Sequence, residues 1–497
     1  SATQIHGNGV DSGLGQARGQ RLFRPAAQKL LKQSLAQAEL EFTRGTEDQA
    51  RRMLAEAPPA RLQLPDGLTD TLRHYQQDGF EFLADRSSYR IGAILADDMG
   101  LGKTLQVLAL LAASREQENE EKEEEAPAEG LEPRAALVVC PASVVSVWQD
   151  EAAKFCPQLK CQLYAGPPAE RKRFLEAGDW DLLVTNYALV RQDAASFCRY
   201  RYDFVILDEA QQIKNPDAQV TQVVKKLQTR RPLALTGTPV ENRLLDLWSI
   251  MDFLNPDFLG PRDEFNGVLG SPAQCADVGR RIAPVILRRT KEMVAPELPP
   301  RTEELLRIEL GPLQQRIYDT EIAAARENLG RHGAIEILAA LIRLRQICCH
   351  PHLLEKYRET KAEATKLNAL SEMLAEIVDE GHSALVFSQF TSMLAMIKPA
   401  LDEGGISNLM ITGSTPTSQR ADLVKSFAES GEPQVFLLSL KAASTGLTLT
   451  KADYVFLYDP WWNPAVERQA IDRTHRIGQE KPVIAYRLVA TGTVEEK

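Results

Sequence analysis

The chain contains 497 residues with a formal net charge of −10, a length that predicts two or three domains rather than one core. No apolar run approaches the roughly 20 residues of a membrane-spanning helix, and the polar, glycine-rich start lacks the apolar centre of a secretory signal. The seven cysteines are scattered without a Cys-x-x-Cys pair, which argues against a disulfide framework or a zinc site.

Residues 1–60 form a lead-in that we expect to be helical or partly disordered. Amphipathic helical patterns cover 25–42 and 46–56. They fit the tail of an upstream domain or a helical brace, and the sequence assigns them no function.

A glycine-rich loop between a predicted strand and a predicted helix is the most informative local pattern. The apolar run Ile91–Ala96 predicts the strand, and Leu105–Ala113 predicts the helix. In the loop, backbone N–H groups and the helix dipole would bind phosphate, Lys103 would reach the terminal phosphates of a nucleotide, and the Thr104 hydroxyl would hold Mg²⁺. Asp97 replaces the usual first glycine, so a glycine-rich turn that caps an ordinary helix is the alternative. The loop reads Asp97-Asp98-Met99-Gly100-Leu101-Gly102-Lys103-Thr104.

The segment after this helix is strongly acidic. Between Arg115 and Glu125 it holds seven glutamates and only two basic residues. We expect a solvated surface loop over about 115–130, inserted before a strand at Ala135–Cys140. A partner-binding acidic loop or a DNA mimic is the functional alternative. Because acidity is concentrated here, the net charge does not exclude a nucleic-acid-binding groove elsewhere.

A second candidate for chemistry follows the buried-strand pattern Tyr202–Leu207, which ends directly in Asp208 and Glu209. If this strand lies next to the strand before the glycine loop, Asp208 can complete the Mg²⁺ shell. Glu209 could then orient or deprotonate the attacking water. The alternative is that the two carboxylates only cap the next helix. The glycine loop upstream favours the catalytic interpretation.

Strands and helices continue to alternate downstream, as expected for an open parallel sheet. Leu244–Phe253 predicts a helix, and Ile282–Leu287 predicts a strand that leads into the basic pair Arg288-Arg289. Leu298-Pro299-Pro300 marks the crossing to a second domain, because consecutive prolines break helices and stiffen the chain.

The second domain is predicted to begin with a helical region over 312–356 and to continue as an alternating α/β region over about 366–497. Cys348, Cys349 and His350 are adjacent, but neighbouring cysteines on a helix point about 100° apart, so we expect helix packing rather than a shared metal. The apolar residues expected to be buried along one helical face are Ile335, Leu338, Ala339, Ile342, Leu344 and Ile347.

A series of motifs in this order resembles the Swi/Snf-type ATPase core of helicase superfamily two, over about residues 62–497. The glycine loop and the Asp208-Glu209 pair are two of these motifs. Because so many motifs occur in the family's order and approximate spacing, the resemblance is specific. The others are Leu72–Gln76, Val138–Pro141, Val184–Tyr187, Leu235–Pro239, Arg288–Lys291, Arg345–Pro351, Val386–Phe390, Gly413–Thr415, Thr445–Leu449 and Gln469–Gln479.

The resemblance implies an α/β fold of two RecA-like lobes with parallel sheets and helical protrusions. The first lobe would span 61–297, with a protrusion over about 244–281. The second would span 298–497, with a protrusion over about 312–356. The family normally continues into a bracing helix beyond this point, so we expect the second lobe to be truncated at its C-terminal end.

The resemblance further implies a DNA-stimulated ATPase that uses ATP and Mg²⁺, with Thr104 and Asp208 as metal ligands. The catalytic residues that it implies are Lys103, Asp208, Glu209, Arg473 and Arg476. The nucleotide-binding residues that it implies are Arg73, Gln76, Asp98, Met99, Gly100, Leu101, Gly102, Lys103, Thr104, Gly446 and Gln469.

Arg473 and Arg476 are expected on one helical face of the second lobe, three residues apart. As arginine fingers, they would reach the γ-phosphate only when the lobes close. The alternative is that they are surface charges paired with Asp472 and Glu467.

Nucleic-acid contacts are expected from hydroxyl, amide and backbone groups at strand ends, which suit sequence-independent phosphate binding. The neighbouring Trp461 could contact nucleic acid or pack within the lobe, and the sequence favours neither interpretation. The residues implied are Ser143, Thr185, Asn186, Ser388, Gln389, Gly413, Arg420, Lys441 and Trp462.

The function implied is translocation on double-stranded DNA, largely independent of sequence, with remodelling or displacement of a DNA-bound protein such as a nucleosome or RNA polymerase. One alternative is a strand-separating or RNA-directed helicase. Another is a nucleotide-gated DNA-binding scaffold without turnover. We expect a monomeric core inside the cell, in the cytoplasm, nucleoid or nucleus.

Overall fold

The structure is a computed structural model that describes residues 62–120, 132–237, 244–268, 278–328, 334–443, 449–461 and 464–496. The chain forms two compact units. The first holds residues 1–97, 103–140 and 148–288, and the second holds 98–102, 141–147 and 289–497. The helices predicted over 25–42 and 46–56 lie outside the described residues.

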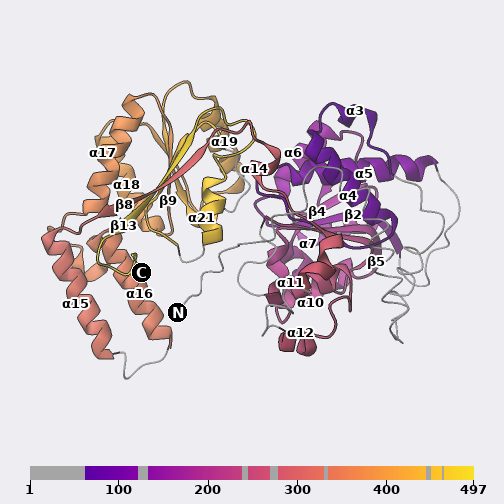
Figure 1. Cartoon of the computed structure of the whole chain (residues 1–497), viewed down its shortest axis with the longest axis horizontal. Helices are drawn as coiled ribbons and strands as arrows, with labels where there is room; N and C mark the ends of the chain where they lie inside the picture. Colours follow the sequence, from indigo (N-terminus) through magenta and orange to yellow (C-terminus); the bar gives the residue numbers. More distant parts are fainter. Residues whose placement is uncertain are drawn as a thin grey trace. The chain divides into compact units, whose positions relative to one another are not determined.

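The first unit is built on a seven-stranded parallel sheet with the order β3-β4-β2-β5-β6-β1-β7 (Figure 1). Its central strands are apolar and buried, as parallel strands covered on both faces must be. This confirms the predicted open parallel sheet. Its strands are β1 (Ala93–Leu95), β2 (Glu132–Cys140), β3 (Cys161–Leu163), β4 (Leu182–Asn186), β5 (Tyr200–Asp208), β6 (Gln228–Leu235) and β7 (Ile286–Leu287).

Helices alternate with these strands along the chain and bury apolar residues against the sheet. The hydrophobic core contains Trp248, Ile250 and Met251 from the helix predicted over Leu244–Phe253, which the structure confirms as α11. The helices are α3 (Asp66–Thr69), α4 (His74–Ser88), α5 (Lys103–Glu120), α6 (Val145–Phe155), α7 (Pro168–Ala177), α8 (Tyr187–Gln192), α9 (Ala194–Phe197), α10 (Gln219–Val224), α11 (Leu244–Leu254) and α12 (Arg262–Val268).

The strand order corrects one prediction. We expected β5 to lie next to β1, but β6 separates them. Leu235 of β6 is in register with both Leu95 of β1 and Asp208 of β5. Asp208 therefore lies level with the start of the glycine loop, one strand further away. The pattern along a chain predicts strands but not which strands become neighbours.

Two boundaries also differ from expectation. The helix after the glycine loop, α5, continues through Glu120, so the first part of the predicted acidic loop is helical. Glutamate and glutamine favour helix, which allows α5 to extend into the acidic segment. The strand predicted over Ile282–Leu287 is reduced to β7, because the 3₁₀ turn Ala283–Val285 precedes it. Pro284 inside that turn has no N–H to donate to a sheet.

The second unit contains a six-stranded parallel sheet with the order β10-β11-β9-β12-β13-β8. The strand β8 was not anticipated: it pairs with β13, the last strand, along its whole length. Among the described residues, no helix is both long enough and apolar enough to cross a membrane. The strands are β8 (Arg301–Ile308), β9 (Ala384–Ser388), β10 (Asn408–Ile411), β11 (Val435–Ser439), β12 (Tyr454–Leu457) and β13 (Val483–Ala490).

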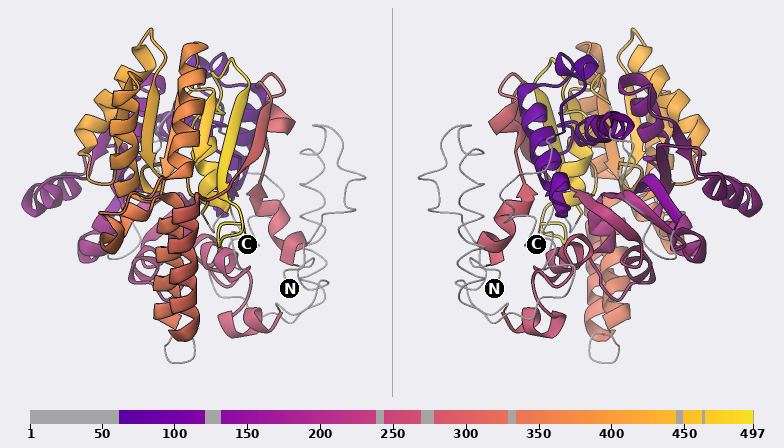
Figure 2. Two further views of the ribbon diagram at one scale, coloured as in Figure 1. Left: turned by 90° about the vertical axis from the view of Figure 1, so that its left-hand side faces the viewer. Right: turned by 90° about the vertical axis from the view of Figure 1, so that its right-hand side faces the viewer.

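The helical region of the second unit forms a hairpin of α15 and α16, which run side by side at one end of the sheet (Figures 1 and 2). The prediction of one buried face holds only for the C-terminal half of α16, where Leu344 and Ile347 are buried. Leu338 and Ile342 are exposed. The helices are α14 (Lys291–Val294), α15 (Pro312–Asn328), α16 (Ala334–Cys349), α17 (Thr365–Asp379), α18 (Thr391–Glu403), α19 (Thr417–Glu429), α20 (Leu440–Ala443) and α21 (Pro464–Ile471).

A fully buried ion pair joins distant segments of the second unit. Lys366 Nζ lies 2.5 Å from Glu495 Oε2, and both side chains are completely shielded from water. Lys366 also donates to the backbone carbonyls of Tyr458 (3.0 Å) and Leu488 (2.9 Å). The carboxylate accepts a second hydrogen bond from the N–H of Ala490. The pair therefore holds the start of α17 against the ends of β12 and β13.

Lys366→Met should destabilise the second unit by about 3–5 kcal/mol, because it leaves the Glu495 carboxylate buried without its cation. The double variant Lys366→Met/Glu495→Gln should recover much of this loss. Lys398→Met, which breaks the exposed pair with Asp402, is the control and should change little. Urea denaturation measures all three, and a single Lys366 variant as stable as the control would contradict the prediction.

Candidate functional site

The glycine loop joins β1 to α5 in the way that the sequence predicts. Gly100 and Gly102 have φ angles of 87° and 75°, in the left-handed region that side chains disfavour. These two glycines let the chain turn sharply into the first turn of α5, whose N–H groups have no partner within the helix. Lys103 Nζ donates to the carbonyl of Asp97 at 2.7 Å, which folds the lysine back along the loop. The local geometry is that of an anion-binding helix N-terminus.

Asp97, which stands where a glycine is usual, is completely buried. Its carboxylate accepts a hydrogen bond from Gln106 Nε2 at 3.3 Å, one turn into α5. The substitution therefore ties the loop to the helix that follows it.

Asp208 lies at the carboxyl end of β5 and is almost completely buried. Trp148 Nε1 donates to its Oδ2, and the N–H of Glu209 donates to its Oδ1, both at 2.9 Å. The Tyr187 hydroxyl donates to its backbone carbonyl at 2.8 Å. Burial, together with the charge of Glu209, raises the pKa of Asp208 to about 6, while the Trp148 hydrogen bond and the charge of Lys103 oppose this rise.

Glu209 adopts an unusual backbone conformation for a residue with a side chain, with φ of 49°. Such strain tends to occur at functional positions. Gln211 Nε2 donates to Glu209 Oε2 at 2.6 Å, and Thr236 Oγ1 donates to Gln211 Oε1 at 2.9 Å. A relay of hydrogen bonds thus connects the Glu209 carboxylate to the end of β6.

The residues of the first unit suit a magnesium nucleotide. A hydroxyl at Thr104 and a carboxylate at Asp208 are the oxygen ligands that Mg²⁺ prefers. Lys103 supplies a cation near enough to Asp208 to lower its pKa. The burial of Asp208 makes its charge costly unless a cation compensates it, which favours metal binding.

Further predicted nucleotide ligands are divided between the units. Arg73 precedes α4, and its N–H donates to Gln76 Oε1 at 3.0 Å. Gln469 lies half-buried on α21 of the second unit. Gly446 lies outside the described residues.

Arg473 and Arg476 are not on a helical face as predicted. The helix α21 ends at Ile471, and both arginines lie in the turn that follows. Arg473 is buried, and its carbonyl accepts a hydrogen bond from Leu449. The positions of the two arginines are therefore set by contacts within this turn, and not by the spacing of residues along a helix.

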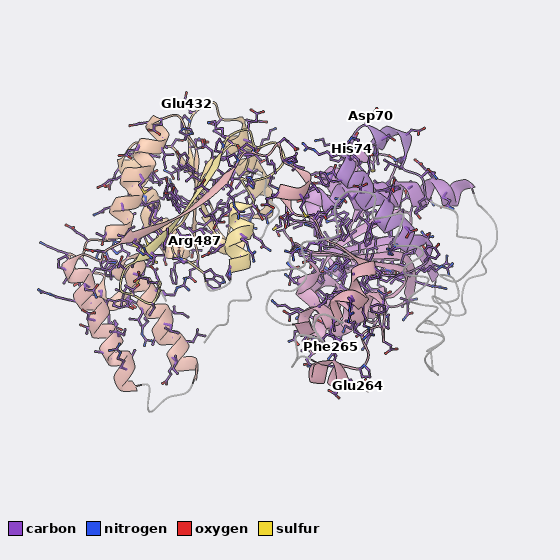
Figure 3. All side chains as sticks on the ribbon, viewed as in Figure 1. Asp70, His74, Glu264, Phe265, Glu432 and Arg487 are labelled. Atoms are coloured by element: carbon purple, nitrogen blue, oxygen red, sulfur yellow. The ribbon has the colours of Figure 1, made fainter. Side chains whose placement is uncertain are left out.

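Both carboxylates named as alternative partners of these arginines bind other cations. Asp472 Oδ1 lies 2.6 Å from Lys291 Nζ and 3.4 Å from Arg301. Glu467 lies 3.1 Å from Arg487, which Figure 3 labels in the second unit. Lys291 also donates to the carbonyl of His475, so it holds the turn from two sides.

The predicted nucleic-acid residues differ in what they can offer. Thr185 and Ser388 are completely buried at the ends of β4 and β9. Asn186 caps α8 by accepting the N–H of Leu189. Arg420 donates to the carbonyls of Thr412, Gly413 and Thr415, which orders the turn that carries Gly413.

The four remaining members of this set differ in how much of their surroundings the structure describes. Ser143 is half-buried, whereas Trp462 and the side chain of Lys441 lie outside the described residues. Gln389 is half-buried and contacts Arg345.

Sequence reasoning missed several residues that hold the site. Trp148 and Tyr187 both bind Asp208, Gln211 holds Glu209, and Lys291 holds the arginine turn. Tyr187 belongs to the motif Val184–Tyr187 that the sequence displays, and a buried carboxylate such as that of Asp208 needs hydrogen-bond donors. The sequence pattern alone does not predict which hydrogen-bond donor will contact which carboxylate.

Comparison with known proteins decides the family. The profile of the SNF2-related domain matches residues 75–353, more than half of the chain. The chain belongs to the SNF2-related family. The profile of the helicase conserved C-terminal domain matches residues 365–478 of this SNF2-related chain. The chain therefore carries both an SNF2-related domain and a helicase conserved C-terminal domain.

Relatives with names are similar over most of this chain. An uncharacterized ATP-dependent helicase of Mycoplasma pneumoniae is 35% identical over 433 residues, which cover 86% of this chain and 41% of that protein. The human SWI/SNF-related matrix-associated actin-dependent regulator of chromatin subfamily A member 1 is 30% identical over 96% of this chain and 48% of its own length. The chain thus spans less than half the length of these relatives.

A solved structure, the SWI2/SNF2 ATPase core of Sulfolobus solfataricus in complex with dsDNA, is 32% identical. The match covers 88% of this chain and 92% of that one, with a TM-score of 0.46.

Trp148→Phe removes the hydrogen bond to Asp208 without opening a large cavity. We predict that the Mg²⁺ concentration for half-maximal ATPase activity rises about tenfold, because hydrogen-bond partners that orient a metal-binding group typically contribute about 10–100-fold to metal affinity. Magnesium titration of steady-state ATP hydrolysis is the measurement. Trp180→Phe is the matched control, since Trp180 donates only to the carbonyl of Phe174. Equal magnesium requirements in both variants would exclude this role.

Proposed function

We propose that this chain is a DNA-stimulated ATPase that uses ATP hydrolysis to move along double-stranded DNA. The observation that carries the proposal is the buried Asp208 carboxylate in a member of the SNF2-related family. It lies within the electrostatic reach of Lys103 and is held by Trp148. This arrangement suits a metal-bound polyphosphate.

In this proposal, the glycine loop and residues of the first unit bind and orient the substrate. The glycine loop binds phosphates, Lys103 neutralises them, and Thr104 with Asp208 binds Mg²⁺, which supplies charge stabilisation when bound. Glu209 orients or deprotonates the attacking water. Gln211 and Thr236 fix the Glu209 carboxylate, so a structural change at the end of β6 would alter the position of Glu209, the proposed base.

Arg473 and Arg476 belong to the second unit and would complete the site as arginine fingers. A finger typically contributes about 10³–10⁵ in rate, which corresponds to roughly 4–7 kcal/mol. Hydrolysis would then require the lobes proposed over 61–297 and 298–497 to close on each other. A duplex that binds both lobes could favour closure and so stimulate turnover.

Double-stranded DNA is the proposed track, and a DNA-bound protein is the proposed object of remodelling. The human relative is named as a regulator of chromatin, which supports this class of target. The Mycoplasma relative is named as a helicase, which supports strand separation as the second candidate.

Arg476→Ala should leave nucleotide affinity within about threefold but lower kcat by about 10³-fold or more, because a finger acts in the transition state. Isothermal titration with a nonhydrolysable ATP analogue measures binding, and steady-state assays measure turnover. Arg468→Ala changes an exposed arginine on α21, just before this motif, and should behave like the parent chain. Normal turnover in the Arg476 variant would remove the finger from the mechanism.

Steady-state ATPase measured with duplex DNA, single strands and RNA tests the function directly. We predict the strongest stimulation by duplex DNA and a steep loss of stimulation between 50 and about 200 mM salt, because phosphate contacts release counterions. Lys103→Ala supplies the background rate. Preference for single strands together with unwinding of an annealed oligonucleotide would establish the helicase instead. Binding without any turnover would establish a scaffold.

A further inference from the structure

One buried lysine contacts both the glycine loop and the arginine turn, Asp472–Arg476. Lys291 is 4% exposed. Its N–H donates to Asp98 Oδ2 at 3.2 Å. Its Nζ lies 2.6 Å from Asp472 Oδ1 and also donates to the carbonyl of His475. The two ends of one residue thus contact two separate segments, and all of these residues belong to the second unit.

The glycine loop is joined to the segment that carries Lys291 by two hydrogen bonds of Asp98. The N–H of Asp98 donates to the carbonyl of Arg289 at 3.0 Å, and its carboxylate accepts the N–H of Lys291. The carbonyl of Asp98 accepts the N–H of Leu101 at 3.4 Å. These bonds fix the backbone of the loop on either side of Gly100, where N–H groups are proposed to bind phosphate.

The arginine turn is held by three residues that follow β7. Besides Lys291, Arg301 Nη1 lies 3.4 Å from Asp472 Oδ1, and His475 Nε2 donates to the carbonyl of Pro299 at 2.9 Å. Burial lowers the pKa of Lys291, and the charge of Asp472 opposes this fall. The carboxylate therefore helps to keep the buried ammonium charged, and displacement of the turn would break this pair.

The side chain of Arg476 lies directly against the glycine loop. A Cβ atom placed on Gly100 would come within 2.9 Å of Arg476 Cγ and 3.1 Å of Arg476 Nε. Because Gly100 also has a φ of 87°, both its conformation and this close approach require glycine. The Nε atom belongs to the guanidinium, so positive charge from the arginine turn lies beside the loop that is proposed to bind phosphates.

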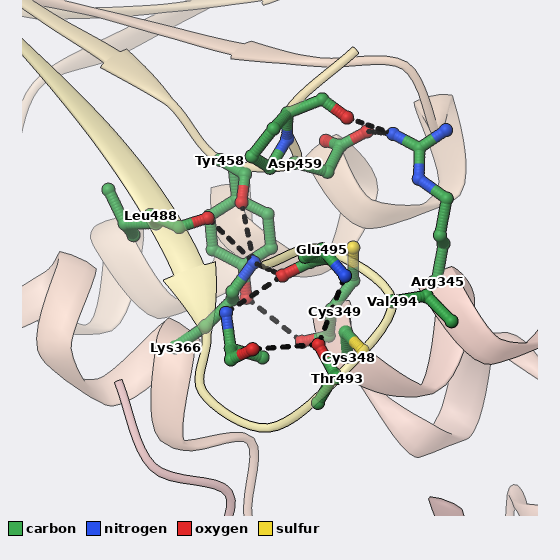
Figure 4. A network of polar contacts seen from close by, with 12 residues as sticks. Arg345, Cys348, Cys349, Lys366, Tyr458, Asp459, Leu488, Thr493, Val494 and Glu495 are labelled. Atoms are coloured by element: carbon green, nitrogen blue, oxygen red, sulfur yellow. Dashed lines mark hydrogen bonds and ion pairs between the residues drawn. The ribbon is translucent and has the colours of Figure 1, made fainter. Parts of the chain in front are cut away.

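A second buried lysine of this unit shows what a structural ion pair does. Lys366 pairs with Glu495 and donates to the carbonyls of Tyr458 and Leu488 (Figure 4). These contacts hold the start of α17 against the ends of β12 and β13. Lys291 differs, because its contacts join two loops to which the proposed chemistry is assigned.

We propose that Lys291 is a positioning residue for ATP hydrolysis: it holds the arginine turn on the glycine loop, so that Arg476 stays beside the bound phosphates. This inference rests on the proposed function, since it names what places the proposed arginine finger. Lys291 acts through Asp472, the carbonyl of His475 and Arg476, and not by contact with nucleotide. Loss of its ammonium would release the turn and leave the glycine loop able to bind nucleotide.

The test compares Lys291→Met with Lys425→Met. Lys425 forms an exposed pair with Glu429 on α19 of the same unit, at 3.9 Å. Isothermal titration measures the affinity for a nonhydrolysable ATP analogue, and steady-state hydrolysis with duplex DNA measures kcat. We expect Lys291→Met to keep the affinity within about threefold and to lower kcat about tenfold or more, because a finger acts in the transition state. Lys425→Met should stay within about twofold of the parent in both quantities.

A double-variant cycle separates positioning from general damage. If Lys291 acts through Arg476, Lys291→Met should lower kcat by less than about twofold when it is added to Arg476→Ala, because the group that it positions is already missing. A structural defect alone would lower kcat by the same factor in both backgrounds.

Lys291→Met/Asp472→Asn keeps the test decisive if Lys291→Met folds poorly. It removes both charges of the pair, so neither is left buried without its partner. Thermal unfolding checks that this variant is folded. It should show the same loss of kcat, about tenfold or more, with analogue affinity within about threefold of the parent.

The possible failures are distinguishable. A parent chain that does not hydrolyse ATP would overturn the proposed function, and this inference fails with it. Normal turnover in Arg476→Ala would leave Lys291 no finger to position, so the inference fails again. If the parent and Arg476→Ala behave as proposed, two results would show that only the role of Lys291 is wrong. One is a folded Lys291→Met with the kcat of Lys425→Met, and the other is an equal loss in both backgrounds of the cycle.

Discussion

A carboxylate shielded from water at the end of a buried strand is costly unless donors and cations surround it, and Asp208 imposes this constraint on the first unit. Trp148, Tyr187 and the N–H of Glu209 satisfy the residue on the protein side. Burial and the charge of Glu209 nevertheless raise its pKa. In the proposed function, a metal ion bound to nucleotide phosphates would supply the compensating positive charge. The proposed roles of the glycine loop, of Lys103 and of the hydrogen bonds from Glu209 to Thr236 all depend on this one carboxylate.

The second unit contains buried cations, which likewise need compensating partners. Lys366 is surrounded by a carboxylate and two carbonyls, and Arg345 by an amide oxygen, a carbonyl and an aromatic ring. Both lie under the ends of parallel strands, where loops carry function. Lys291 gives the arginine turn comparable support through Asp472.

Local patterns predicted much of this fold because strands and glycine loops depend on neighbours in sequence. Confirmed examples are β1 after Ile91, β5 ending in Asp208, and the start of α11. The order of β1, β6 and β5, the addition of β8 to the second sheet and the Trp148–Asp208 bond all join residues far apart in the chain, where no periodicity operates. The arginine pair was placed wrongly because helical spacing was assumed beyond Ile471, where the chain turns. The roles of the catalytic and nucleic-acid residues stay predictions.

In the proposed mechanism, ATP turnover requires groups from two units whose arrangement responds to nucleotide and DNA together. Nitroxide labels on Asp70→Cys and Glu432→Cys, exposed positions in different units (Figure 3), would report the distance between the units by pulsed electron spin resonance. We predict one narrow, new distance distribution when a nonhydrolysable ATP analogue and duplex DNA are both present, and a lesser change with either alone. A distribution that is the same under all four conditions would contradict the account.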